Sequence, residues 1–163
     1  MSYNLTGAAY GGNITLSKAA LAAGTTTTYT TANAVTYAIK GQLYSLAAAS
    51  NAATPVVDAN TGLAFKPLAL NQACVFAFLV DASGNVTVAQ GAIVSNLDLT
   101  GGAGAAQFPG YKDDRTPFGY LLAQAGPTAV GNWTFGVNNL SGVTGLTNTF
   151  RDVMDSPAQP ITG

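Results

Sequence analysis

Residues 73–80 place the strongest constraint on the fold of this chain. Every side chain of the segment is apolar, including Cys74, Phe76 and Phe78. A strand that is apolar on both faces needs cover on both sides, as at the centre of a packed architecture or at a subunit interface. The sequence therefore predicts a strand here that is buried on both faces.

Residues 35–46 predict a β-hairpin around a two-residue turn, Lys40 and Gly41. Gly41 supplies the positive φ that such a turn requires, although lysine is a poorer first turn residue than asparagine or aspartate. Opposed residues share a face of the sheet, so the larger side chains fall together while Thr36 and Ser45 lie on the other face. The predicted pairs are Ile39 with Gln42, Tyr37 with Tyr44, and Val35 with Leu46.

The other β-prone segments are separated by Gly, Pro and Asn, and no long amphipathic helix is predicted between them. Residues 81–85 predict a type I turn followed by Gly84 in the left-handed region. Residues 25–31 suit an edge strand or a linker, residues 47–70 a long connection, and residues 98–116 a loop. Further strands are predicted at 13–17, 86–90, 117–123, 133–137 and 147–154. The predicted fold class is all-β, as a β-sandwich or a jelly-roll-like barrel with long loops.

The length of 163 residues suits one domain. A chain of this size removes roughly 70% of its extended-chain surface from water, so it needs neither a disulfide nor a metal ion to fold. Residues 25–163 are assigned to a single β domain. Residues 1–24 are rich in Gly, Ala and Asn and have two interpretations, an extended N-terminal arm or the first strand of the sheet.

Charged side chains are scarce. They make up 8% of the residues, against about 25% in an ordinary soluble domain. Free monomers usually keep a mixed, charged surface because it resists association. A surface of Ala, Gly, Thr, Ser and Asn instead lies against neighbouring chains without desolvating charge. We therefore expect much of this surface to face protein, as in a homo-oligomer.

The charge and hydropathy patterns also argue against two classes of partner. The six bases are scattered singly, without a basic stripe, so we expect no nucleic-acid partner. No apolar run approaches the length of about 20 residues that spans a bilayer, so we expect no membrane partner. The first residues lack the basic start and apolar segment of a signal peptide, and we expect synthesis in the cytoplasm.

The residues that usually carry catalysis or bind metal are missing or poorly placed. Histidine is absent, so Ser-His and Cys-His nucleophile pairs are excluded. Cys74 is interpreted as an inert core thiol, and Asp113 with Asp114 as a solvated turn. The glycines at 101, 102 and 104 are not followed by the lysine and helix of a phosphate loop. We expect no catalytic residue, no metal site and no cofactor, and therefore not an enzyme.

Two further patterns have a structural and a functional interpretation. Residues 81–85 resemble a calcium loop in their polar residues but lack its later glutamate, which favours a hairpin turn. Trp133, Tyr120, Tyr111 and Phe135 would form an aromatic platform for a glycan if they were exposed together. Aromatic residues at alternating strand positions are more often core residues, and that is the interpretation we favour.

The order of segments from Val35 onward resembles a family of small structural proteins of tailed bacteriophages, of the head decoration (cement) or head-fibre type. Lys40 departs from the Asp-Gly turn that this pattern leads us to expect. The resemblance implies a β domain that commonly assembles as a trimer, binds the outer capsid surface and bridges neighbouring major capsid subunits. The matching segments are residues 37–45, 75–91, 117–122, 133–137 and 147–153.

The resemblance and the scarcity of charge together favour a location on the virion, at the capsid surface, after synthesis in the host cytoplasm. The alternative is a tail-fibre or baseplate module that binds a host-surface glycan through exposed aromatic side chains. A surface adhesin subunit is a third hypothesis, against which the lack of a signal-peptide pattern argues.

Overall fold

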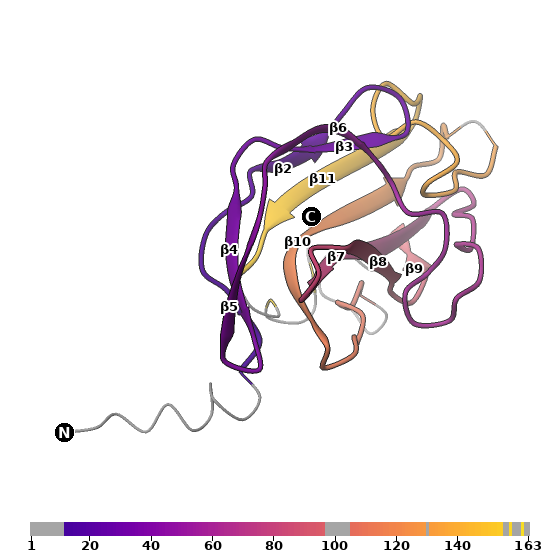
Figure 1. The fold of residues 1–163 in the computed structure, drawn as a ribbon. Helices are drawn as coiled ribbons and strands as arrows, with labels where there is room; N and C mark the ends of the chain where they lie inside the picture. Colours follow the sequence, from indigo (N-terminus) through magenta and orange to yellow (C-terminus); the bar gives the residue numbers. More distant parts are fainter. Residues whose placement is uncertain (1–11, 97–104, 130, 155–156, 158–160, 162–163) are drawn as a thin grey trace.

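The computed structural model describes residues 12–96, 105–129, 131–154, 157 and 161 of the chain. Within these residues the protein is all-β, without an α-helix, and eleven strands form three antiparallel sheets (Figure 1). This confirms the predicted fold class, and the three open sheets pack around one core in the manner of a β-sandwich. The strands are β1 (Ile14–Thr15), β2 (Leu21–Ala23), β3 (Thr28–Thr31), β4 (Val35–Ile39), β5 (Gln42–Leu46), β6 (Ala49–Ala53), β7 (Gln72–Asp81), β8 (Val86–Gln90), β9 (Val94–Ser95), β10 (Arg115–Ala125) and β11 (Leu146–Asp152).

The main sheet has the strand order β11-β10-β7-β8, and β9 also pairs with β7. All residues of β7 between Gln72 and Asp81 are fully buried, which confirms the prediction for residues 73–80. Strand β10 pairs with β7 along its whole length, with a bulge between Pro117 and Gly119. The bulge places Phe118 in the core, where its side chain is inaccessible to solvent.

One face of the main sheet is covered by the two smaller sheets, β1-β4-β5 and β2-β3-β6. Tyr37 of β4 and Tyr29 of β3 pack into the same buried cluster as Phe78 of the main sheet. Hydrogen bonds also join the sheets, since the Tyr37 hydroxyl donates to the Asp81 carbonyl at 2.8 Å. The small sheets therefore form one layer of the sandwich, and in Figure 1 the β4–β5 hairpin lies to the left of the main sheet.

The opposite face of the main sheet is covered by irregular chain. Ala106, Phe108 and Ile161 pack with the buried residues Val75 and Leu79 of β7 in a second cluster. The backbone supports this layer, because the Ile161 N–H donates to the Ala106 carbonyl at 2.8 Å. Strand β7 is thus covered on both faces, and this explains its apolar sequence.

The hairpin of β4 and β5 has the predicted register, with Val35 opposite Leu46, Tyr37 opposite Tyr44 and Ile39 opposite Gln42. Both turn residues have positive φ, 51° at Lys40 and 79° at Gly41. These values are those of a type I′ turn, whose twist matches the strands that it joins. Lysine occupies a position that asparagine or glycine adopts with less strain.

Three predictions about individual segments are wrong. The sequence predicts an edge strand or a linker at residues 25–31, yet β3 is the central strand of β2-β3-β6. Residues 47–70 were expected as a connection, yet they contain β6, which pairs with β3. Residues 133–137 were expected as a strand, yet only Trp133 makes a bridge, to Leu68, and a turn follows it. In the first two cases tertiary pairing decides against local propensity, and in the third the positive φ of Gly136 turns the chain.

Residues 12–24 lie against the domain and contribute β1 and β2, whereas residues 1–11 fall outside the described part of the chain. Thr15 and Ala19 are completely buried. The Asp152 carboxylate accepts hydrogen bonds from the N–H groups of Ala20 and Leu21, at 3.1 and 3.0 Å. These two hydrogen bonds, which we call the Asp152 clasp, join the start of β2 to the end of β11.

Candidate interaction surface

The aromatic residues considered for a glycan platform lie in two separate places. Trp133 is 4% exposed and Phe135 is fully buried, both in the core cluster. Tyr120 and Tyr111 instead pack with the cluster on the opposite face of the main sheet, around Phe108. These four side chains therefore do not form a common exposed platform.

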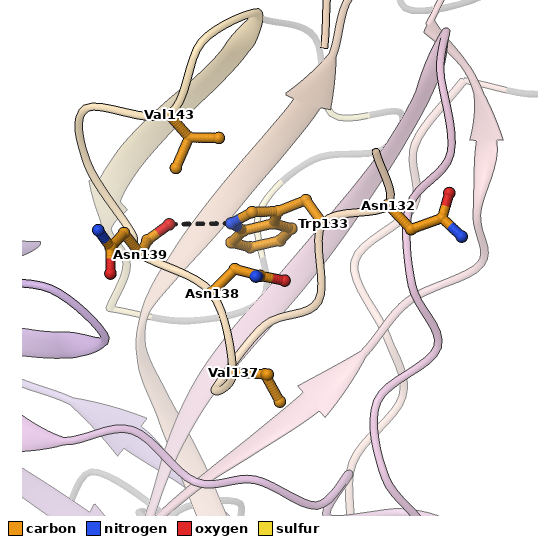
Figure 2. Close-up of a pocket in the computed structure, with 6 residues that line it drawn as sticks. All are labelled: Asn132, Trp133, Val137, Asn138, Asn139 and Val143. Carbon is orange, nitrogen blue, oxygen red and sulfur yellow. Dashed lines mark hydrogen bonds between the residues drawn. The ribbon is translucent and has the colours of Figure 1, made fainter. Parts of the chain in front are cut away.

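A pocket of about 280 Å³ lies beside Trp133 (Figure 2). The indole N–H donates to the Asn139 carbonyl at 2.9 Å, and the Thr134 N–H donates to the side-chain oxygen of Asn138 at 2.7 Å. The mouth carries exposed amides and the exposed Val137, while the indole ring itself is buried. The pocket therefore presents amides and a valine, without an aromatic face on which a sugar could stack.

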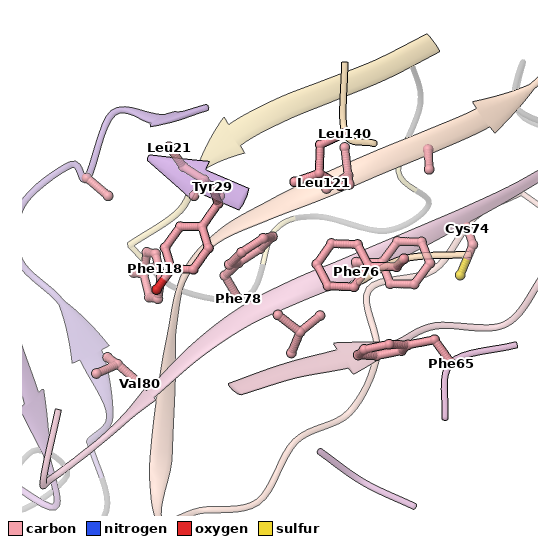
Figure 3. Packing of buried hydrophobic residues seen from close by; sticks show 14 of the residues in the cluster. Leu21, Tyr29, Phe65, Cys74, Phe76, Phe78, Val80, Phe118, Leu121 and Leu140 are labelled. Carbon is pink, nitrogen blue, oxygen red and sulfur yellow. The ribbon is translucent and has the colours of Figure 1, made fainter. Parts of the chain in front are cut away.

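Cys74 lies in the core beside Phe76 and Phe65 (Figure 3). Burial raises the pKa of its thiol to about 12. The thiol donates to the Gly91 carbonyl at 3.2 Å. A neutral, enclosed thiol is a poor nucleophile, so the geometry fits the predicted structural role.

The carboxylates singled out in the sequence have separate partners. Asp114 forms an ion pair with Arg115 at 2.8 Å, and the hydrogen bond from Arg115 lowers the pKa of Asp114. Asp113 is exposed and lies 3.9 Å from the ammonium of Lys40. Among the described residues no three His, Cys, Asp or Glu side chains come together as a metal site. The glycines at 101, 102 and 104 lie outside the described residues.

The Asp81 carboxylate organises the hairpin turn between β7 and β8. It accepts hydrogen bonds from the N–H groups of Ser83 and Asn85, at 2.8 and 2.9 Å, and from the Asn85 side chain at 2.9 Å. Burial acts to raise the pKa of Asp81, but these hydrogen bonds and the charge of Arg115 outweigh it and lower the pKa. The carboxylate is thus engaged within its own turn, where Gly84 has a φ of 80°.

One carboxylate that the sequence did not single out is buried. Asp58 is 6% exposed and accepts hydrogen bonds from the Gln90 N–H at 3.1 Å and the Thr61 hydroxyl at 2.9 Å. It also accepts from the Asn60 N–H at 3.3 Å. These bonds hold the loop before β7 against β8, so Asp58 has a structural role.

The outer face of the β1-β4-β5 sheet carries two exposed large apolar strand residues, Ile14 and Leu43. Ile14, Ala38 and Leu43 are directly opposed across the three strands, on the face that points away from the main sheet, although Ala38 between the other two is only 8% exposed. Ile14 is 38% exposed, Leu43 is 60% exposed, and Leu16, just after β1, is 45% exposed. The remaining strand residues on this face are Thr36 and Ser45, so its strands present no charged side chain.

We call the face formed by Ile14, Leu16, Ala38 and Leu43 the outer apolar face. The sequence did contain a signal for it, since Ala38 and Leu43 alternate with the larger residues that face the core. This face is exposed because the main sheet covers the other face of the β1-β4-β5 sheet. The sequence alone does not show which of the two faces the main sheet covers. In the described part of the chain no helix is long and apolar enough to cross a membrane.

Comparisons with known proteins do not indicate a function for this surface. No protein-family model, curated protein or solved structure matches the chain.

Proposed function

We propose that this protein is a virion structural protein that binds the outer surface of a capsid and bridges neighbouring major capsid subunits. It acts as a decoration, or cement, protein and as a homo-oligomer, with a trimer favoured. The observation that carries the proposal is the outer apolar face, which exposes leucine and isoleucine without charge on a chain with 8% charged residues. Covering such a face does not require desolvation of charge.

The size of the face indicates why several copies act together. Burying a leucine-sized side chain completely is worth about 1.5–3 kcal/mol. Ile14, Leu16 and Leu43 are already about half covered, so contact with a capsid gains roughly 3 kcal/mol per copy. A dissociation constant of 1 mM already corresponds to about 4 kcal/mol, so one such contact is too weak to hold a single chain. An oligomer that engages several sites gains affinity through effective concentration.

The proposal is tested by mixing purified protein with undecorated capsids and measuring the protein that sediments with them. We expect stoichiometric, saturable binding. Leu16→Asp places a charge on the outer apolar face and is expected to weaken binding at least tenfold, which corresponds to about 1.4 kcal/mol. Val137→Asp is the matched control, because Val137 is 64% exposed and lies outside this face.

Two results would overturn the proposal. Binding to tails or to bacterial cells, without binding to capsids, would assign the chain to the tail-fibre or baseplate class. Equal loss of capsid binding in both variants would show that the outer apolar face is not the contact. Light scattering tests the oligomer separately, and a stable monomer at micromolar concentration would contradict a trimer.

A further inference from the structure

Strand β5 is an outer strand of its sheet, and its outward edge has no partner among the residues described. Ile39 and Gln42 close the two-residue turn as a hydrogen-bonded pair, so Leu43 and Ser45 direct their N–H and C=O groups away from β4. No other described segment forms a hydrogen bond with these groups. We call this row of backbone groups the β5 edge.

Three of the other outer strands are covered or irregular, whereas the β5 edge is neither. The Thr15 N–H of β1 donates to the Met154 carbonyl at 2.9 Å, and the Val88 carbonyl of β8 accepts from the Ala59 N–H at 2.8 Å. The pairing of β6 with β3 is irregular, and Asn51 within β6 has a φ of 53°. Strand β5 has a regular register and none of the charged side chains, prolines or bulges that prevent pairing at exposed edges. Such an edge is suited to accept another strand.

The β5 edge is complementary to itself. Two copies of β5 can run antiparallel about a twofold axis at Tyr44, with Leu43 of each copy opposite Ser45 of the other. In this register Leu43 and Ser45 exchange both of their hydrogen bonds, so every outward N–H and C=O group of the two residues is satisfied. All five residues of β5 are then paired, because Gln42 of each copy lies opposite Leu46 of the other.

The side chains suit the same register. Tyr44 is partly buried and stacks on Tyr37, with ring centroids 5.7 Å apart. At the axis the two copies of Tyr44 form a non-hydrogen-bonded pair, where side chains come closest and aromatic pairs are favourable. On the other face of the sheet Leu43 of each copy lies beside Ser45 of the other, so the outer apolar face continues across the axis.

Charge does not oppose this contact. Residues 41–57 contain no charged side chain, so β5 and the chain that follows it are neutral. Lys40 is the charge nearest to β5 in the sequence, and the proposed register places the two copies of Lys40 about 27 Å apart along the paired strands. That distance exceeds the screening length of about 8 Å at physiological ionic strength. Two copies therefore meet without repulsion between like charges.

We propose that two copies of this chain pair through the β5 edge, about a twofold axis at Tyr44. The three strands β1-β4-β5 of each copy then form one continuous antiparallel sheet across the axis. This inference goes beyond the proposed function, because the contact does not depend on a capsid. One partner fills the β5 edge, so the threefold contact of a trimer would use a different surface.

A single cysteine tests the register. A non-hydrogen-bonded pair places its Cα atoms about 4.5 Å apart, within the range for a disulfide, so Tyr44→Cys is expected to form a disulfide-linked dimer under mild oxidation. Thr36→Cys is the control, because Thr36 is exposed in the same sheet but lies at least three strand spacings, about 14 Å, from its counterpart. The native Cys74 is buried and does not compete. Equal cross-linking of the two variants, or none in folded Tyr44→Cys, would overturn the proposal.

Blocking the edge tests the contact through the mass of the assembly. Ser45→Pro removes an outward N–H, and proline is tolerated on an edge strand at such a position, so the hairpin is expected to fold. We expect light scattering to give half of the wild-type mass. Ser45→Thr is the matched control, because it keeps the N–H and should keep the wild-type mass. An unchanged mass in Ser45→Pro would contradict the pairing, whereas the capsid sedimentation assay bears on the proposed function alone.

Amide hydrogen exchange followed by NMR gives a readout that needs no variant. At millimolar protein concentration the Leu43 and Ser45 amides are expected to exchange at least about tenfold more slowly than an unprotected amide. The Tyr44 and Leu46 amides face β4 and are expected to be slow with or without a second copy. Fast exchange at both Leu43 and Ser45 under these conditions would show that the β5 edge is open and would refute the pairing.

Discussion

Replacing Phe135 by alanine removes a ring from the centre of the aromatic core. The ring is fully buried and stacks on Phe76 with centroids 4.8 Å apart. It meets three more rings edge-on, those of Phe65 at 5.1 Å, Phe78 at 5.8 Å and Trp133 at 6.3 Å. Phe135 and Trp133, whose ring also meets Phe76 at 5.8 Å, therefore attach this loop to the main sheet.

The expected loss of stability follows from these contacts. Truncation of a buried phenylalanine to alanine costs about 3–5 kcal/mol, depending on how far the site collapses. Phe76 and Phe78 belong to the central strand β7 and cannot move into the cavity, so we expect about 4 kcal/mol. For a domain of this size that lowers Tm by about 8–16 °C. A protein with 5–15 kcal/mol of total stability, the ordinary range, remains folded at room temperature.

Urea unfolding followed by two signals tests this value. Trp133 is the single tryptophan and reports on the loop, while far-UV circular dichroism reports on the sheets. We expect both signals to give the same, lowered midpoint in Phe135→Ala. Val137→Ala is the control, because Val137 lies in the same loop but is 64% exposed, and its effect should stay within about 0.5 kcal/mol. An unchanged midpoint by circular dichroism would refute the reasoning, since it would mean that the loop is not part of the cooperative core.

Three further predictions concern single residues. Lys40→Asn should raise stability by about 0.5–1 kcal/mol in thermal denaturation, because asparagine tolerates positive φ better than lysine and the exposed ion pair of Lys40 contributes little; a lower Tm would contradict this. The Cys74 thiol, with its pKa raised to about 12 by burial, should not react with a thiol reagent at pH 8 in the native protein and should react fully in urea; rapid native labelling would show that the site opens. Asp81→Ala should lower the free energy of unfolding by about 1 kcal/mol at pH 7, because it removes the hydrogen bonds that form the turn. Since the folded pKa of Asp81 is below its usual value, this contribution is present above about pH 4 and is lost as the pH falls through the folded pKa; an equal difference between wild type and variant at pH 7 and pH 2 would contradict it.

The parts of the fold that could be predicted are those fixed by local rules. A two-residue turn determines the register of its hairpin, and the pairs from Val35 with Leu46 to Ile39 with Gln42 follow from the position of Gly41 alone. The burial of β7 follows from its sequence, because no polar residue interrupts residues 73–80. Strand β8 follows from the alternation after the turn at Gly84.

The parts that could not be predicted depend on partners distant in the sequence. Strand β6 is built from Ala, Ser and Asn, which have low strand propensity, and it exists because β3 pairs with it. Trp133 and Phe135 alternate as in a strand, but Gly136 with a φ of 76° turns the chain between them and Val137. A side chain at Gly136 would collide with the backbone of Pro55, so this close approach sets the loop.

The outer apolar face could be predicted in part from the sequence. The hairpin register predicts that Ala38 and Leu43 share a face, and Ile14 joins them through pairing of β1 with β4. Which of the two faces is covered depends on Tyr37, whose hydroxyl reaches Asp81 across the sheets. That contact joins residues 44 positions apart, beyond the reach of local patterns.

The clasp between Asp152 and the backbone of Leu21 has a consequence for synthesis on the ribosome. Its two partners are separated by 131 positions, so at 5–20 residues per second the first waits roughly 7–26 s for the second to be made. Thr15 likewise waits for the carbonyl of Pro117, to which its hydroxyl donates. Strands β1 and β2 therefore leave the ribosome before β10 and β11, the strands that they pack against, have been made. In a nascent chain halted before β10, β1 and β2 would remain accessible to chaperones and proteases.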